Sequence, residues 1–282
     1  MPDNPNSVET SPRPLPGHHV LALTGKDALA FAQAQFMNDV TALADGQWQW
    51  NGWLTAKGRL IALFALLRVD AETVWLVLPD YPSAELAEGL KKYVFRSKVV
   101  LTARDDLQVS GRWDAASVTD LREVGRDEEG AVSLAWPGGR RIDISAAPPC
   151  DAAADGVASM RWREADLRAG IPRLDASQTQ QWTPQQLSLG HLQAYSVKKG
   201  CYPGQEIVAR THFLGQAKRG LVLLETGTET EPGTDVMQGD RAIGQVIASA
   251  GKIAQAVLPL APADGELFVG DALAIRHEFA LA

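Results

Sequence analysis

Residues 198–206 have the sequence KKGCYPGQE and contain one of only two cysteines in a chain of 282 residues. Lys198 and Lys199 precede Cys201, and a helix predicted to begin near Gln205 follows it. Nearby cations and a helix N-terminus both favour the thiolate form of a cysteine. The pattern indicates a functional thiol, and the structural alternative is a small apolar residue in a turn. The stretch also stands where the α/β patterns end and a series of short strands begins.

Other chemistry for this thiol has less support from the sequence. His191 and His212 are the histidines nearest to Cys201, but neither lies in a distinctive pattern for a Cys–His pair. One cysteine cannot supply the ligands of a zinc or iron–sulfur site, so we expect no metal site held by this chain alone. Cys150 lies in a linker-like stretch, and nothing indicates that the two cysteines pair.

Composition excludes several classes of protein. The net charge of −7 argues against a general nucleic-acid binder, and no direct nucleic-acid binding is expected. No run of about 18 apolar residues is present, so we expect no membrane-spanning helix. The N-terminus lacks the apolar core of a secretory signal. With two cysteines in the whole chain, a reducing cytoplasm is the expected location.

The first part of the chain alternates between β and α patterns, which predicts an α+β module. Helices are expected at 26–37 and 83–95, and Thr24 or Asp27 could cap the first of them. Strands are expected at 18–25, at 73–79, within 98–113, and within 48–70 on either side of a Lys57-Gly58 turn.

The second part contains weaker strands and further helices, and the last part contains strands alone. Strands at 131–138 and 140–145 are followed by helices at 159–169, at 184–190 and from about Gln205. From Lys218 onward, short strands separated by glycines predict a barrel of about five or six strands. The expected units are a disordered tail at 1–17, α+β modules at 18–110 and 111–215 that can interleave, and a barrel at 216–282.

Two compositional features point to a flat, anionic ligand. Cations are unusually dense near the cysteine, where Glu206 is the only nearby carboxylate, and they could bind carboxylates of a ligand or form a solvated helix face. These cations are Lys198, Lys199, Arg210, Lys218 and Arg219. Tryptophans could stack on a heterocycle such as a pterin, with core packing as the alternative; the ones considered are Trp48, Trp50, Trp53 and Trp162. The candidates for holding a pterin edge are Asp39, Asn51, Glu164 and Glu206.

The string KGCYPGQE (199–206), followed by VAR (208–210) and G-x-x-K-R (215–219), resembles the signature of the YgfZ-type folate-binding proteins. These proteins are relatives of the glycine-cleavage T-protein, an aminomethyltransferase. The resemblance extends over about residues 18–280. It includes LTGKDALAFAQAQFMNDV (23–40), LTAKGRL (54–60), ADLRAGIPRL (165–174) and GDRAIGQVIASA (239–250).

The resemblance implies a three-part, ring-like aminomethyltransferase-type fold that binds tetrahydrofolate in a central channel. It also implies support of iron–sulfur protein assembly or repair, and of the tRNA modification and oxidative-stress resistance that depend on such proteins. The expected partners are folate and iron–sulfur client or assembly proteins. The implied functional residues are the thiol of Cys201 with Lys199, and the implied folate contacts are Trp162, Lys198, Tyr202, Gln205, Glu206, Arg210 and Asp39.

Two positions depart from the related patterns. One tryptophan linked to folate in such proteins would fall near residue 18, where this chain has His18. The T-protein branch has an acidic residue just before its Ala-Gly-Ile/Met-Pro step, and this chain has Arg168 there. The second departure and the conspicuous thiol favour the accessory-protein interpretation. A folate-dependent one-carbon (aminomethyl) transferase is the alternative, and whether the protein is an enzyme stays open.

Overall fold

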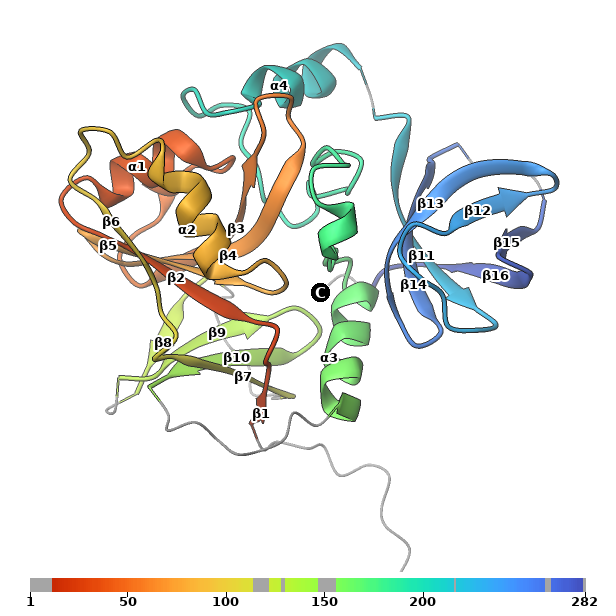
Figure 1. Ribbon diagram of the computed structural model, residues 1–282, viewed down its shortest axis with the longest axis horizontal. Coiled ribbons are helices and arrows are strands. Elements are labelled where there is room, and N and C mark those ends of the chain that lie inside the picture. Colours follow the sequence, from red (N-terminus) through yellow and green to blue (C-terminus); the bar gives the residue numbers. More distant parts are fainter. Residues whose placement is uncertain are drawn as a thin grey trace, which may run out of the picture.

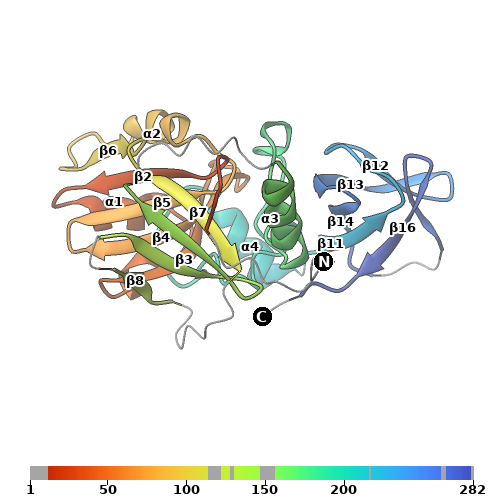
Figure 2. The same ribbon diagram turned by 90° about the horizontal axis from the view of Figure 1, so that it is seen from below.

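The structure is a computed structural model (Figure 1), and it describes residues 12–113, 122–127, 130–146, 156–215, 217–261 and 265–280. These residues form two five-stranded sheets and a closed six-stranded barrel. Figures 1 and 2 show the two sheets on one side, the barrel on the other, and one long helix between them. The prediction of two α+β modules followed by a small β-barrel is confirmed.

The first sheet is antiparallel, and its inner strand β4 is buried on both faces along most of its length. The strands in spatial order are β3 (Gln47–Leu54), β4 (Leu60–Asp70), β5 (Thr73–Leu78), β2 (His19–Thr24) and β6 (Val100–Ala103). Alternate β4 residues enter different cores: Phe64 and Leu66 pack in the core of the first module, whereas Ala65 and Leu67 pack in the core shared with other parts. Side chains of a strand point to opposite faces in turn, so a central strand between two cores is a continuous apolar run.

Helices α1 (Ala28–Gln35) and α2 (Ser83–Lys91) contribute to the core of the first module. Phe31 of α1 and Leu86 and Leu90 of α2 are buried there. Asp27 precedes α1, but its carboxylate does not cap the helix and instead accepts a hydrogen bond from the Lys98 backbone N–H at 2.7 Å. The predicted cap at Asp27 is therefore wrong, and the carboxylate binds the backbone of a segment distant in the sequence instead.

The second sheet is also antiparallel and includes the N-terminal end of the described chain. Its strands in spatial order are β1 (Arg13–Pro14), β7 (Gln108–Trp113), β10 (Arg140–Ser145), β9 (Val132–Trp136) and β8 (Val124–Arg126). Composition placed residues 12–17 in a disordered tail. In the structure β1 pairs with β7, and the buried Leu15 donates its N–H to the Val109 carbonyl. The rest of the predicted tail, residues 1–11, lies outside the described residues.

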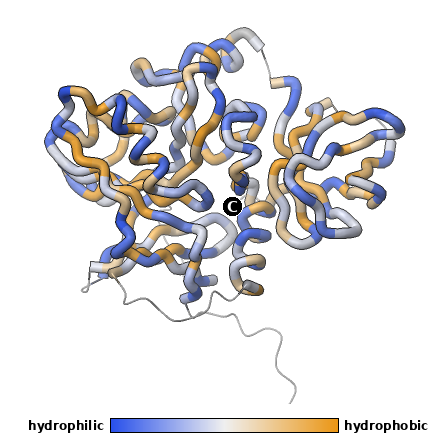
Figure 3. Tube along the Cα trace, viewed as in Figure 1, coloured by the Kyte–Doolittle hydropathy of each residue, from blue (hydrophilic) through white to orange (hydrophobic). Residues whose placement is uncertain are grey.

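The barrel closes because its first strand pairs with its last. The strands in spatial order are β11 (Arg219–Thr226), β14 (Ile253–Pro259), β13 (Arg241–Ala250), β12 (Asp235–Gln238), β15 (Leu267–Val269) and β16 (Ala272–His277). Leu224, Val236 and Val246 belong to its interior. The apolar stretches in Figure 3 lie mostly along strands, and polar colours are frequent in the turns of the barrel.

Helix α3 (Gly156–Arg168) contacts β13 and β14 of the barrel, and the chain then returns to the first sheet. Gln180 donates its N–H to the Leu60 carbonyl, and the Leu60 N–H donates to the carbonyl of Trp182. The two modules therefore exchange segments along the chain. The short helices η1 (Val40–Ala42) and η2 (Ala176–Gln178) and helix α4 (Gln205–Leu214) complete the described elements.

The helix predicted at 184–190 is wrong. This segment is a series of hydrogen-bonded turns, with the Leu187 N–H bonded to the Thr183 carbonyl. Ser188 has a φ of 52°, in the left-handed region that interrupts a right-handed helix. No helix in the described ranges has the length and apolar character needed to cross a membrane.

Candidate functional site

Lys199 fastens the loop of residues 198–204, here called the cysteine loop, to the end of helix α1. Its Nζ donates hydrogen bonds to the carbonyls of Gln33, Phe36 and Asn38, at 2.5, 2.6 and 3.2 Å. An ammonium has three hydrogens, so these three carbonyls satisfy it. A cation at this position also complements the negative end of the helix. Lys199 is buried, and its Nζ lies 4.9 Å from the ring centre of Tyr202.

Burial lowers the pKa of Lys199 from 10.5 to about 8, against the opposing attraction of Asp39. The side chain is thus charged at neutral pH but loses its proton more easily than an exposed lysine. We expected this cation to lie beside the Cys201 thiol. In the structure its donors go to backbone carbonyls, and no hydrogen bond to the thiol is found among the described residues.

Two glycines let helix α4 begin directly against the turn between β3 and β4. Gly204 precedes α4 with φ 80°, and a Cβ there would lie 2.6 Å from the Thr55 carbonyl oxygen and 2.7 Å from the Gly58 Cα. Gly58 has φ 68°, and a Cβ there would lie 2.8 Å from the Cβ of Ile207. The approach is therefore backbone against backbone. It brings together LTAKGRL and KGCYPGQE, two stretches on which the resemblance rests.

Cys201 is a free cysteine on the exposed side of the cysteine loop. Lys198, Glu206 and Arg210 are exposed as well, whereas Tyr202 is buried. Gln205, the remaining predicted contact next to the loop, is half-buried. Gln205 donates its Nε2 hydrogen to the Lys199 carbonyl at 3.0 Å, which closes the loop on itself.

The two histidines considered as partners of Cys201 pack against aromatic rings. The His191 ring stacks on Phe279, and His212 lies against Phe213. Arg219 donates to barrel carbonyls of Ile243 and Val257 and is not part of a cationic patch around the thiol. No three His, Cys, Asp or Glu side chains are placed to hold a metal ion in the part of the chain that the structure describes.

Asp39 and Asn51 lie close to the same end of α1. The Asp39 carboxylate accepts hydrogen bonds from Thr41 and Gln33, and the bond from the Thr41 hydroxyl is the main cause that lowers the pKa of Asp39. Asn51 is completely buried, and its Oδ1 accepts the N–H of Asn38 at 2.9 Å. The Nδ2 of Asn51 has no hydrogen-bond partner in the described structure. An unsatisfied buried donor of this kind is costly unless a ligand or water completes it.

Trp162 is buried among other side chains of the protein. The side chain is 1% exposed, with the Arg140 guanidinium 4.4 Å from its ring centre and the edge of Trp113 against it. A Cβ on Gly111 would lie 2.6 Å from the same ring. Stacking of a ligand requires an open ring face, and this packing leaves none.

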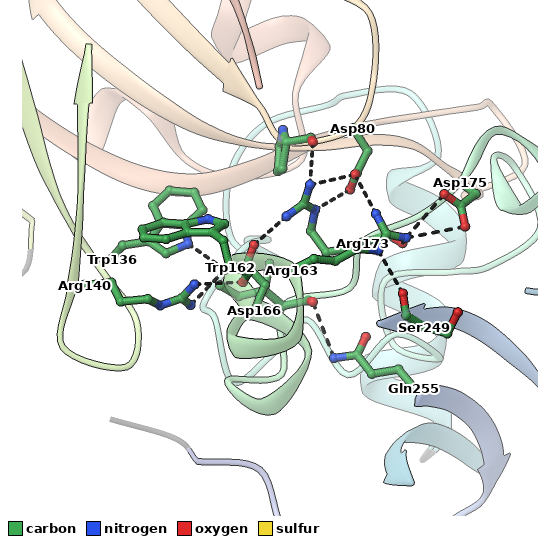
Figure 4. Close-up of polar contacts among 12 residues, drawn as sticks. Asp80, Trp136, Arg140, Trp162, Arg163, Asp166, Arg173, Asp175, Ser249 and Gln255 are labelled. Carbon is green, nitrogen blue, oxygen red and sulfur yellow. Dashed lines mark hydrogen bonds and ion pairs between the residues drawn. The ribbon is translucent and has the colours of Figure 1, made fainter. Parts of the chain in front are cut away.

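Trp162 borders a group of charges that sequence reasoning missed, here called the central polar cluster. Its buried members are Arg140, Asp166 and Arg173, and its half-buried members are Asp80 and Arg163. Figure 4 shows Asp166 at its centre. The fully buried carboxylate contacts Arg140 at 2.8 Å and Arg173 at 2.7 Å and accepts the Trp136 indole N–H at 2.8 Å. Burial alone would raise the pKa of Asp166, but the two arginines outweigh it and hold that pKa below its usual value.

The remaining members extend the central polar cluster to all three parts of the molecule. Arg173 pairs with Asp80, which follows strand β5 of the first sheet, and Arg163 also reaches Asp80. Arg163 donates to the Ser249 carbonyl of the barrel at 3.0 Å. Because Arg140 belongs to the second sheet, the cluster joins both sheets, α3 and the barrel. The only sequence signal was the resemblance of ADLRAGIPRL, which contains Asp166 and Arg173.

His18 and a tryptophan group lie next to the central polar cluster. His18 is buried with its ring 6.4 Å from that of Trp136, and Trp136 in turn contacts Trp48 and Trp50. Burial, together with Arg173, holds the pKa of His18 well below its usual value. The Nε2 of His18 and the Nε1 of Trp48 have no hydrogen-bond partners in the described structure.

Two curated relatives of the chain carry the same name. No protein-family model matches the chain. The chain is 31% identical over 281 residues to the "tRNA-modifying protein YgfZ" of Cronobacter sakazakii (strain ATCC BAA-894), covering 91% of this chain and 85% of that protein. It is 34% identical over 253 residues to the protein of the same name from Klebsiella pneumoniae (strain 342), covering 80% and 77%.

A solved structure shares the architecture. The crystal structure of glycine cleavage system aminomethyltransferase T from Bartonella henselae matches with a TM-score of 0.75 over 96% of this chain and 85% of that chain. The sequence identity is 16%, so this likeness shows the fold alone. The identities to the two curated relatives span most of each protein, and the predicted resemblance is confirmed. The chain belongs to the YgfZ family.

Proposed function

We propose that this protein binds tetrahydrofolate and supports the assembly or repair of iron–sulfur proteins, with Cys201 as its working thiol. Membership of the YgfZ family supports the coarse assignment, because the relatives are named tRNA-modifying proteins. The role proposed for the thiol is supported most by the exposure of Cys201, on a loop that Lys199 and Gly204 hold at the start of α4. The likeness to an aminomethyltransferase shows architecture only, so one-carbon transfer is not proposed.

A thiol in this position is suited to reaction with a partner rather than to a reaction inside the protein. It is exposed, and no hydrogen bond between it and a histidine or a carboxylate is found within the described ranges. Lys198 on the cysteine loop and Arg210 on helix α4 are exposed cations that can attract an anionic partner. We therefore assign Cys201 to thiol exchange with, or transient ligation of, a client protein.

The proposal that folate binds here rests on a buried hydrogen-bond donor that has no partner in the protein. A pterin ring has several nitrogen and oxygen acceptors along its edge. Asn51 Nδ2 is buried and unsatisfied in the described structure, near Asp39 at the end of α1, which suits recognition of such an edge. Asp39 can accept from an amino group there, and Lys198 and Arg210 can neutralise the glutamate tail. Because Trp162 is buried among its neighbours, we propose that it supports the wall of the site and does not stack on the ligand.

Folate binding is tested by calorimetric titration of the full chain with tetrahydrofolate. Asn51→Asp keeps the Oδ1 acceptor for Asn38 and removes the free amide donor, so affinity should fall at least about fivefold. Trp75→Phe, a change to a half-buried tryptophan of the first sheet, is the control and should bind as wild type does. Wild-type protein that binds no tetrahydrofolate would refute the folate assignment.

The thiol is tested separately, by the activity of a 4Fe–4S enzyme in cells that depend on this protein under oxidative stress. Cys201→Ser should lower that activity towards the level of cells without the protein. Cys150→Ser, which changes the other cysteine of the chain, should not. If Cys201→Ser retains full activity while folate still binds, the thiol has no role and only the folate assignment survives.

A further inference from the structure

A short basic and aromatic segment lies far from the barrel, between helix α2 and strand β6. Residues 91–98, KKYVFRSK, are here called the basic loop. They contain four cations and no carboxylate, in a chain whose net charge is −7. Figure 1 shows the segment beyond the end of α2, on the side of the first sheet opposite the barrel. The basic loop is therefore a positive region on a protein whose net charge is negative.

The aromatic side chains of the basic loop are turned outward. Phe95 is 87% exposed and Tyr93 is 44% exposed, and Val100 just beyond the loop is 62% exposed. Three of the nine large apolar side chains found exposed in the described chain thus fall within eight residues. Single exposed apolar residues are ordinary on protein surfaces, whereas a group of them marks a contact surface.

The backbone holds Phe95 outward at an energetic cost. Its φ is 38°, in the left-handed region that is unfavourable for a bulky side chain. Hydrogen bonds from the Val94 N–H to the Lys91 carbonyl and from the Ser97 N–H to the Val94 carbonyl fix the turn around it. Tyr93 is anchored by its edge-to-face contact with the buried Trp53, at 6.2 Å between ring centres.

A cation lies close to each of the Phe95 and Tyr93 rings. The Arg96 guanidinium lies 5.3 Å from the Phe95 ring centre, and the Lys92 ammonium lies 5.7 Å from that of Tyr93. Neither cation has an ion pair within the described residues. Two carboxylates lie nearby: Glu88 pairs with Lys91, and Asp27 accepts the Lys98 backbone N–H. The four cations of the basic loop outnumber these two carboxylates, so the surface is positive.

We propose that the basic loop binds an unpaired segment of RNA, with bases stacked on Phe95 and Tyr93 and phosphates held by Lys92, Arg96 and Lys98. Every base has a face that can stack on an aromatic ring, and a basic surface follows the phosphate backbone. An acidic protein segment would use the cations but not the exposed aromatic rings. This site is independent of the thiol and of folate, and the net charge of the chain does not reveal it because the charge is local.

The test is fluorescence anisotropy of the full-length protein with a fluorescein-labelled single-stranded RNA of about 12 nucleotides. Phe95→Ala should weaken binding at least about fivefold, since stacking on one ring is worth about 1–3 kcal/mol per base. Phe213→Ala is the matched control, because Phe213 is a second exposed phenylalanine, 68% exposed, on α4. It should bind RNA as wild type does. Phe95 is exposed, so its replacement should leave the folded state intact, which circular dichroism verifies.

The cations give a second readout. Lys92→Gln and Arg96→Gln should each reduce the slope of log affinity against log salt by about 0.7, between about 50 and 200 mM salt. Arg241→Gln, a change to an exposed arginine of the barrel, should leave the slope unchanged. The proposal is overturned if wild type does not bind the RNA or if Phe95→Ala binds as tightly as wild type. Binding to vesicles of anionic phospholipid without binding to RNA would assign the loop to a membrane surface instead.

Discussion

At the scale of single residues, the function of a lysine depends on what surrounds its ammonium group. Lys198 and Lys199 are neighbours in the sequence, yet one is exposed and the other donates to three carbonyls at the end of α1. A buried ammonium loses hydration, which lowers its pKa. Lys199 therefore holds the cysteine loop against the end of α1, and Lys198 is the lysine that a partner can reach.

The lowered pKa of Lys199 predicts how stability depends on pH. The unfolded chain keeps this proton up to about pH 10.5, whereas the folded protein releases it from about pH 8. The contribution of Lys199 to the free energy of unfolding is thus constant below pH 8 and becomes more favourable as pH rises towards 10.5. Urea unfolding should show wild type gaining up to about 1.4 kcal/mol per pH unit over Lys199→Met in this window.

The matched control for this measurement is Lys198→Met, which removes the exposed neighbour. Lys198→Met should show the same gain in stability between pH 8 and 10 as wild type, because it keeps Lys199. At pH 7, Lys199→Met should cost about 1–3 kcal/mol, because three carbonyls lose their donor. A wild-type advantage over Lys199→Met that stays constant with pH would contradict the buried, easily deprotonated lysine.

At the scale of elements, the start of α4 is set by contact with another turn. The residue before α4 is Gly204, whose backbone touches Gly58 and Thr55. The helix therefore begins where two left-handed glycines allow two backbones to meet. This contact, together with Lys199, places Cys201 at the surface beside the first module.

The two glycines of the cysteine loop should respond very differently to substitution. Gly204→Ala should destabilise the protein by about 1–3 kcal/mol, because the new Cβ meets backbone atoms and φ is positive. Gly200→Ala should change stability by less than about 0.5 kcal/mol, since no atom lies within 4 Å of its Cβ position. Thermal unfolding measures both, and equal effects would show that the docking of α4 on the β3–β4 turn is not tight.

At the scale of the whole molecule, the central polar cluster joins parts that are separate in the sequence. Asp166 and Arg163 come from α3, Asp80 from the first sheet, and Arg140 from the second sheet. Gln255 of the barrel adds a hydrogen bond to the Leu167 carbonyl, also drawn in Figure 4. Buried charges of this kind specify one arrangement of the parts, because any other would leave a charge without its partner.

Removal of the central carboxylate should therefore be costly. Asp166→Asn leaves Arg140 and Arg173 facing a neutral amide, and the free energy of unfolding should fall by about 3–5 kcal/mol. Glu164→Gln breaks the exposed pair with Arg168 on the same helix and should cost less than about 1 kcal/mol. Urea unfolding measures the free energy of unfolding of both variants. A loss for Asp166→Asn as small as that for Glu164→Gln would contradict the proposal that the central polar cluster holds the parts of the molecule together.

Local patterns were sufficient for the features that depend on nearby residues. Alternating and 3.6-residue periodicity located most strands and helices, and glycine spacing located the barrel. The string KGCYPGQE identified the family, which the curated relatives confirm. The segment 184–190 shows the limit, because its composition allows a helix but the positive φ of Ser188 ends one.

What the sequence determined by itself is the family, the α+β modules with their barrel, and the position of a thiol before a helix. Only the tertiary structure decided which groups the charges and rings meet. It turned the Lys199 ammonium to the end of α1, enclosed Trp162 behind Arg140, and gathered the arginines around Asp166. Propensity and spacing act over a few residues, whereas burial and ion pairing depend on segments that only the folded chain brings together.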